Sequence, residues 1–252
     1  MKYNNSNRVV AIIEARMTST RLPGKVLLEA CGKPLLAHLI ERLQRSVCVN
    51  KVIVATTKND TDNPIANLAE KLCIGCFRGS EHDVLARVLD AATAFNADTI
   101  VEITGDCPAL DPDVVDKCVT AFFENKVDFV ANRIKPSYPG GMDVRVFSTK
   151  TLKEVELVSK NDPAAREHVS LPITENTKKY KILNVEAEPE LCMPDFDIEL
   201  DEPKDYEMIR TMFEALYPNN PQFNLGDIIA YIKKHPEIMA INKSVSRKNA
   251  RE

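Results

Sequence analysis

Residues Val9-Val10-Ala11-Ile12-Ile13 form a short run without a polar side chain, and this run decides the fold class. Such a run is typical of a strand that is buried on both faces of a parallel sheet. Two more runs, Lys51 to Thr56 and Thr99 to Ile103, have the same character. Between them, apolar residues recur at helical spacing, as they do from Leu35 to Leu43. Strands that alternate with helices predict an α/β fold, a Rossmann-like, mostly parallel sheet sandwiched by helices.

The second half of the chain is less regular. We expect strands at 128–131, 142–147, 180–185 and 196–200, and helices at 149–158, 203–216 and 225–234, with another helix starting near 163. No composition shift divides the chain, so residues 1–241 are expected to form a single domain. The last residues, 242–252, carry Lys243, Arg247, Lys248 and Arg251 and little to bury, which predicts a flexible tail.

Composition narrows the class of protein. The net charge of −4 argues against a protein that works by coating nucleic acid. No segment approaches the roughly 20 apolar residues of a membrane helix, and the polar start does not resemble a signal peptide. An odd number of cysteines, seven, favours reduced thiols; a zinc site at Cys73 and Cys76 is disfavoured because no second pair lies at suitable spacing. We therefore expect a cytoplasmic protein that needs neither nucleic acid nor a membrane as partner.

The loop after the first expected strand concentrates positive charge. Arg16, Arg21 and Lys25 lie within ten residues, together with the hydroxyl groups of Ser19 and Thr20. In open parallel sheets, ligands bind beyond the carboxyl ends of the strands. Guanidinium and ammonium groups there suit an oligophosphate, although a solvated basic surface is the simpler alternative. Neither a dinucleotide fingerprint nor a P-loop is present.

Six motifs occur in an order that is characteristic of one family. They read AIIEARMTSTRLPGK (11–25), FRGSEHDVLAR (77–87), ITGDCP (103–108), YPGGMDV (138–144), REHV (166–169) and LDEPKD (200–205). The chain resembles the cytidylyltransferases that activate sugar acids, the acylneuraminate and 3-deoxy-octulosonate enzymes. Its nearest branch is the one named for spore-coat polysaccharide biosynthesis protein F. The resemblance implies transfer of CMP from CTP to a sugar acid with release of pyrophosphate, for a surface polysaccharide or glycan.

The resemblance also implies roles for individual residues. Lys25, Arg16 and Asp106 would be catalytic, and Mg²⁺ would bind Asp106 and Asp201, with Asp195 or Asp197 as alternatives to Asp201. The nucleotide would contact Ala15, Ser19, Arg21, Arg78, Gly79 and Ser80. The acceptor would contact Asn132, Arg166 and His168, with Arg133 as a further candidate. Structural alternatives are a helix N-cap for Asp201, a plain turn for Gly79 and an ion pair between Asp83 and Arg87.

Two departures from the family pattern leave other functions open. Thr18 stands where the family usually has glycine, and Glu14 stands where glutamine is usual. One alternative is a nucleotidyltransferase that acts on a sugar phosphate or another phosphorylated acceptor; another is a non-catalytic nucleotide-binding subunit. Residues 135–185 resemble the smaller acceptor and dimerisation lobe of relatives, which implies a homodimer.

Overall fold

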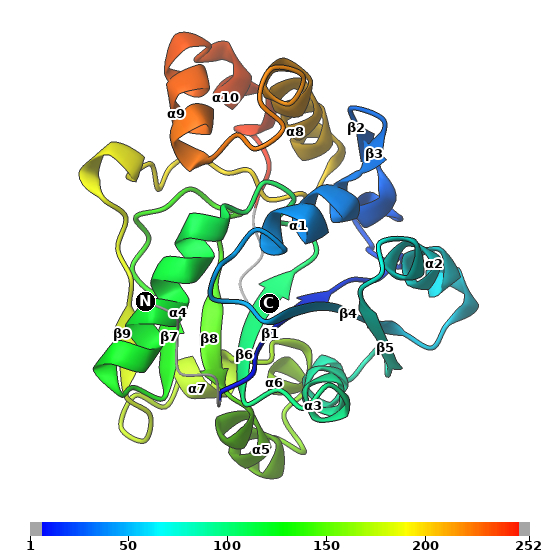
Figure 1. Ribbon diagram of the computed structural model, residues 1–252, viewed down its shortest axis with the longest axis vertical. Helices are drawn as coiled ribbons and strands as arrows, with labels where there is room; N and C mark the ends of the chain where they lie inside the picture. Colours follow the sequence, from blue (N-terminus) through cyan, green and yellow to red (C-terminus); the bar gives the residue numbers. More distant parts are fainter. Residues whose placement is uncertain (1–6, 247–252) are drawn as a thin grey trace.

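A seven-stranded sheet forms the centre of the protein in a computed structural model that describes residues 7–246 (Figure 1). The strand order is β5-β4-β1-β6-β8-β7-β9. These strands are β1 (Val9–Glu14), β4 (Lys51–Thr57), β5 (Gly75–Gly79), β6 (Thr99–Thr104), β7 (Phe129–Ala131), β8 (Arg145–Ser148) and β9 (Ile182–Asn184). The central strand β1 pairs in parallel with both β4 and β6, and the predicted α/β class is confirmed.

Helices cover both faces of the sheet. One face, which carries Val9, Ala11 and Ile13 of β1, packs against α1 (Leu35–Leu43), α2 (Asn63–Lys71), α4 (Pro112–Asn125), α8 (Pro203–Leu216) and α9 (Leu225–Lys234). The opposite face, which carries Val10 and Ile12, packs against α3 (Val84–Ala94), α5 (Thr149–Val158) and α7 (Leu171–Thr174), with α6 (Pro163–Glu167) against α3. The unbroken apolar run of β1 thus reflects burial on both sides.

Short elements make up the remaining secondary structure of residues 7–246. The hairpin β2 (Glu29–Ala30) and β3 (Lys33–Pro34) lies outside the main sheet, and α10 (Glu237–Asn242) packs on α8. Three 3₁₀ turns are η1 (Lys25–Leu27), η2 (Asp60–Asp62) and η3 (Pro189–Leu191).

Strand β8 interrupts the parallel order. It runs antiparallel to both β6 and β7, and it begins at Arg145 rather than at the expected residue 142. Phe147 of β8 stacks on Phe129 of β7, with ring centroids 5.8 Å apart. Residues 135–185, which we expected to form a smaller lobe, supply β8 and β9 to the main sheet.

The strand expected at 196–200 does not form. The structure instead has an extended loop with a single bridge between Gly140 and Asp197. Asp197 Oδ1 accepts a hydrogen bond from Glu199 N at 2.8 Å, a local turn that competes with a regular ladder. Leu200 N donates to Asp106 O at 2.8 Å, so the loop runs past the end of β6.

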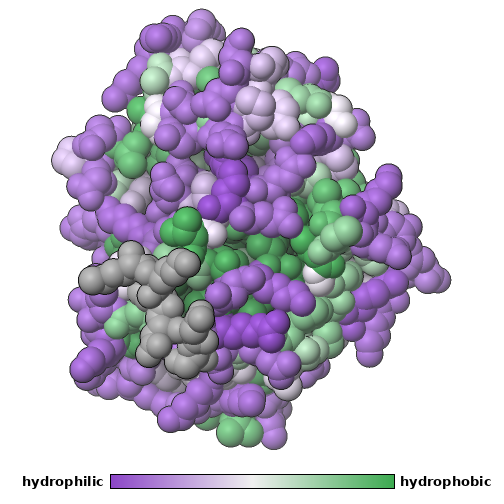
Figure 2. Space-filling model, in the orientation of Figure 1, coloured by the Kyte–Doolittle hydropathy of each residue, from purple (hydrophilic) through white to green (hydrophobic). Residues whose placement is uncertain are grey.

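The surface shown in Figure 2 is mostly hydrophilic, with hydrophobic side chains gathered in its middle band. Among residues 7–246, no helix is both long and apolar enough to cross a bilayer. All seven cysteines are free, and Cys48, Cys107 and Cys118 are buried. The tail expected from residue 242 begins on the last, buried residue of α10, and Arg247, Lys248 and Arg251 lie outside the described residues.

Candidate active site

A buried carboxylate holds the basic loop after β1 in its conformation. Asp62 Oδ1 accepts a hydrogen bond from Met17 N at 2.9 Å, and its other oxygen accepts from Thr56 Oγ1 and Thr57 Oγ1. Burial opposes ionisation of Asp62, yet these hydrogen bonds hold its pKa below the usual value. Gly24, with φ of 72°, turns the loop back so that Gly24 N donates to Met17 O at 2.8 Å. The loop is therefore a preformed structure.

Lys25 follows this turn and bridges two carboxylates. Its Nζ donates to Asp106 Oδ2 at 2.8 Å and to Asp201 Oδ1 at 2.9 Å, and its side chain is only 12% exposed. Arg21 Nη2 lies 2.8 Å from the other oxygen of Asp201. Burial alone would lower the pKa of Lys25, but the two carboxylates raise it above its usual value. The same ammonium holds the pKa of Asp106 low against the effect of burial.

The glycine before Asp106 allows this carboxylate to take its position. Gly105 follows β6, and its N donates to Glu14 O at 2.8 Å across to the end of β1. A Cβ at this position would lie only 2.8 Å from the same oxygen, so a side chain is excluded. The two strand ends are thereby held together, which brings Asp106 beside the basic loop.

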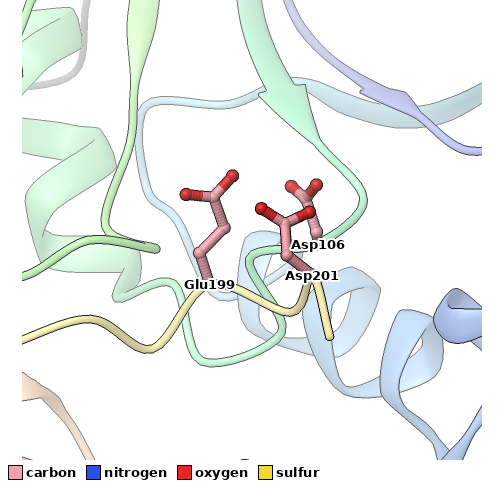
Figure 3. Close-up of side chains that lie close together, drawn as sticks. All are labelled: Asp106, Glu199 and Asp201. Atoms are coloured by element: carbon pink, nitrogen blue, oxygen red, sulfur yellow. The ribbon is translucent and has the colours of Figure 1, made fainter. Parts of the chain in front are cut away.

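Three carboxylates converge at this point. Ligand atoms of Asp106, Glu199 and Asp201 all lie within 4.8 Å of one another, and Figure 3 shows the three side chains pointing the same way. Burial, and then the nearby charges of Asp106 and Asp143, raise the pKa of Glu199 well above its usual value. Such a set of oxygen ligands suits a divalent cation.

Glu199 is the residue that our sequence interpretation missed. The pattern that could have identified it is its spacing from Asp201. Glu199 and Asp201 lie two residues apart on an extended segment, and thus on one side of it. Of the alternatives that we considered, Asp195 is exposed, and Asp197 turns its carboxylate to Glu199 N. The N-cap alternative for Asp201 is wrong, because Glu202 caps α8 in a capping box with Asp205.

The other residues of the basic loop have partners of their own. Arg16 Nη2 lies 3.8 Å from Glu167 Oε1 of α6, Ser19 Oγ accepts from Leu22 N at 3.5 Å, and Ala15 is buried. Thr18 Oγ1 donates to Glu81 Oε1, so the hydroxyl that replaces the expected glycine ties this loop to the segment before α3.

The segment expected to contact the nucleotide base has structural partners of its own. Arg78 donates to Thr57 O, Asn63 Oδ1 and Asn59 O at 2.7–2.8 Å, and thus orders the loop after β4. Gly79 ends β5, where a Cβ would lie 2.8 Å from Arg87 Cγ. Ser80 Oγ accepts from Asp83 N at 3.2 Å.

Asp83 and Arg87 have partners other than each other. The Asp83 carboxylate caps α3 and pairs with Arg166, whereas Arg87 donates to Ser80 O and Glu81 O. Asp83 therefore interacts with Arg166 of α6 rather than with Arg87 of α3, the helix that it caps.

The residues expected to contact the acceptor lie in three different environments. Arg166 pairs with Asp83 and Glu156, and its side chain is mostly buried. Asn132 is fully buried and bonds to backbone groups, accepting from Val144 N and donating to Met142 O. His168 is exposed at the end of α6.

Comparisons with known proteins agree on one family. A family model described as cytidylyltransferase matches residues 10–238. The chain is 33% identical over 248 residues to the uncharacterized protein MJ1063 of Methanocaldococcus jannaschii, covering 97% of this chain and 98% of that one. It is 29% identical to the spore coat polysaccharide biosynthesis protein SpsF of Bacillus subtilis, covering 92% and 96%.

Other matches concern named enzymes. A 3-deoxy-manno-octulosonate cytidylyltransferase of Trichlorobacter lovleyi is 33% identical over 133 residues, 51% of each chain. A solved structure of a cytidylyltransferase from Leptospira borgpetersenii superposes with a TM-score of 0.88 at 32% identity, covering 96% of this chain and all of that one.

Proposed function

Since this chain belongs to the cytidylyltransferase family, and is thus a CTP-dependent nucleotidyltransferase, we propose that it transfers CMP from CTP to a sugar acid. The acceptor is of the octulosonate or nonulosonate type, and pyrophosphate is released. The observation that carries this proposal is the ammonium of Lys25 between Asp106 and Asp201 at the end of the basic loop. In this arrangement a cation that suits phosphate lies beside carboxylates that would hold a metal ion.

In this reaction an acceptor hydroxyl attacks the α-phosphorus of CTP, and the bond to the β-phosphate oxygen breaks. Lys25 is positioned to stabilise the charge that moves onto pyrophosphate. An ammonium has three hydrogens, and Asp106 and Asp201 take two of them, which leaves one for a phosphate oxygen. Arg16 and Arg21 would add charge-assisted hydrogen bonds, with Ser19 and the backbone at Ala15 assisting.

The site fits Mg²⁺ by its donor set. Asp106, Glu199 and Asp201 offer carboxylate oxygens within one coordination sphere, and Mg²⁺ binds one or two carboxylates together with phosphate oxygens. When bound, the ion would neutralise phosphate charge and act as a Lewis acid at the α-phosphate. Asp106 and Asp201 would hold it from two separate segments of the chain.

The acceptor class rests on relatives. The B. subtilis protein is named for spore coat polysaccharide and the T. lovleyi enzyme for 3-deoxy-manno-octulosonate, so a sugar acid for a surface polysaccharide is the acceptor proposed first. A phosphorylated acceptor is the second candidate. We further propose that the enzyme works in the cytoplasm as a homodimer.

Release of pyrophosphate tests the proposal. Wild-type protein is incubated with Mg²⁺, CTP and a panel of sugar acids and phosphorylated alcohols, and then with UTP, GTP or dTTP in place of CTP. We expect turnover with CTP and one sugar acid. Asp106→Asn and Lys25→Ala should each lower kcat by about 10²-fold or more, whereas Lys33→Ala, whose ammonium pairs with Glu41 at the surface, should not. Folded protein that gives no turnover with any acceptor would overturn it.

A further inference from the structure

Three neighbouring strands each place a charged side chain on the same face of the sheet. These side chains lie at the strand ends beside the active site. Glu14 of β1, Glu102 of β6 and Arg145 of β8 alternate with residues of the opposite face, and Glu102 lies directly opposite Arg145. The next residues of the same face, including Ile12 and Phe147, belong to the core under α3 and α5. We call Glu14, Glu102 and Arg145 the charged row.

Hydrogen bonding within the charged row is incomplete. Arg145 Nη1 lies 3.3 Å from Glu102 Oε1, which also accepts from Ser170 Oγ at 3.5 Å. Glu102 is 3% exposed, and within residues 7–246 its Oε2 has no hydrogen-bond partner. Glu14 is partly exposed, but its Oε1 is buried and has no hydrogen-bond partner in that part of the chain. Native interiors rarely leave such oxygens unsatisfied, which points to a ligand that donates hydrogen bonds.

The surroundings indicate what that ligand carries. Burial, and then the charge of Glu102, raise the pKa of Glu14 to about 8, while the guanidinium groups of Arg87 and Arg145 oppose this rise. A hydroxyl group can donate a hydrogen bond to the unpartnered oxygen of either carboxyl, and it brings no further charge into this buried place. Arg145 is 30% exposed, so the charged row is open to solvent at its β8 end.

The charged row also adjoins the reacting groups. Glu14 O accepts from Gly105 N, the residue before Asp106, and Glu14 precedes the loop that carries Arg16 and Lys25. We propose that Glu14 and Glu102 bind hydroxyl groups of a polyhydroxylated acceptor and thereby determine acceptor specificity. This inference rests on the proposed function, which it deepens.

Kinetics of acceptor variants test this inference. Glu14→Leu removes an unpartnered carboxyl without breaking an ion pair, so it should fold, and Glu102→Gln keeps the shape of the side chain. We expect each to raise the acceptor KM about tenfold or more while the CTP KM changes less than about twofold. Glu124→Leu, a change on the exposed side of α4, is the matched control and should alter neither KM.

Deoxy analogues of the acceptor identify the hydroxyl. Removing the hydroxyl that Glu14 binds should raise KM in wild type about tenfold, and the analogue should show no further loss in Glu14→Leu. Turnover by wild type with an unchanged acceptor KM in both Glu14→Leu and Glu102→Gln would overturn this inference alone. Absence of turnover by wild type with every acceptor would overturn the proposed function as well, so the two failures are distinguishable.

Discussion

Asn242, the last residue of α10, donates a hydrogen bond from Nδ2 to Asp205 Oδ1 at 2.9 Å. The same nitrogen donates to Asp197 O at 2.9 Å. The other oxygen of Asp205 accepts from Asp201 N at 3.0 Å and Glu202 N at 2.8 Å. The C-terminal helix is thereby tied to the loop that carries two of the three convergent carboxylates, which makes Asn242 a positioning residue for Asp201.

We predict that Asn242→Ala weakens both the fold and the site. Asp205 is completely buried and loses a donor, which should cost about 1–2 kcal/mol of the free energy of unfolding. Because Asp201 is then held less firmly, kcat should fall several-fold and the Mg²⁺ concentration at half-maximal activity should rise. Urea denaturation and a Mg²⁺ titration of pyrophosphate release measure the two effects. Lys243→Ala, on the exposed neighbour, should leave both unchanged; equal behaviour of the two variants would contradict the positioning role.

A second prediction concerns competition between Lys25 and Mg²⁺ for the same carboxylates. Without Mg²⁺, Lys25→Ala leaves the carboxylates of Asp106 and Asp201 without their shared ammonium, and the free energy of unfolding should fall by about 2–4 kcal/mol. Added Mg²⁺ should raise Tm more in this variant than in wild type, because no ammonium then occupies the site. Thermal unfolding with chelator and with saturating Mg²⁺ gives the comparison, with Lys33→Ala as control. A smaller Mg²⁺ effect in Lys25→Ala would show that the two cations do not share ligands.

The raised pKa of Glu14 predicts that the free energy of unfolding depends on pH. Its pKa is raised from 4.5 to about 8, so the folded protein binds a proton that the unfolded chain has released above about pH 4.5. The contribution to stability is therefore fully present below pH 4.5 and is lost as pH rises toward 8, by an amount on the order of a few kcal/mol. Glu14→Gln should remove this slope. Denaturation of both proteins at several pH values between 5 and 8 measures it, and parallel curves would contradict the raised pKa.

The main features of the fold were predictable because they depend on local pattern. The apolar runs at β1, β4 and β6 identify buried parallel strands, and parallel strands end at a common edge. That geometry brings the basic loop and Asp106 together, as expected from the order of the elements. The position of Lys25 between Asp106 and Asp201 could not be derived this way, because Asp201 comes from a distant loop.

The features that were not predicted depend on tertiary contacts. Strand β8 has four residues, and its antiparallel place between β6 and β7 depends on partners far away in the sequence, such as Phe129. The segment at 196–200 has the composition of a strand, yet the turn at Asp197 and its contact with Gly140 leave it without a ladder. The roles of Glu199 and Glu202 depend on the conformation of that loop, so hydrophobic periodicity could not predict them.

The last prediction concerns Asn132, which we expected on the acceptor side. Its Oδ1 accepts from Val144 N at 2.9 Å and its Nδ2 donates to Met142 O at 2.6 Å, so it fixes the approach to β8. Asn132→Ala would leave both backbone groups buried and unpaired, and the free energy of unfolding should fall by about 2–4 kcal/mol. Asn125→Ala, whose exposed amide bonds to Ala121 O, should cost less than about 1 kcal/mol. If urea denaturation shows equal stability for the two variants while Asn132→Ala raises only the acceptor KM, its role is contact with the acceptor rather than support of this loop.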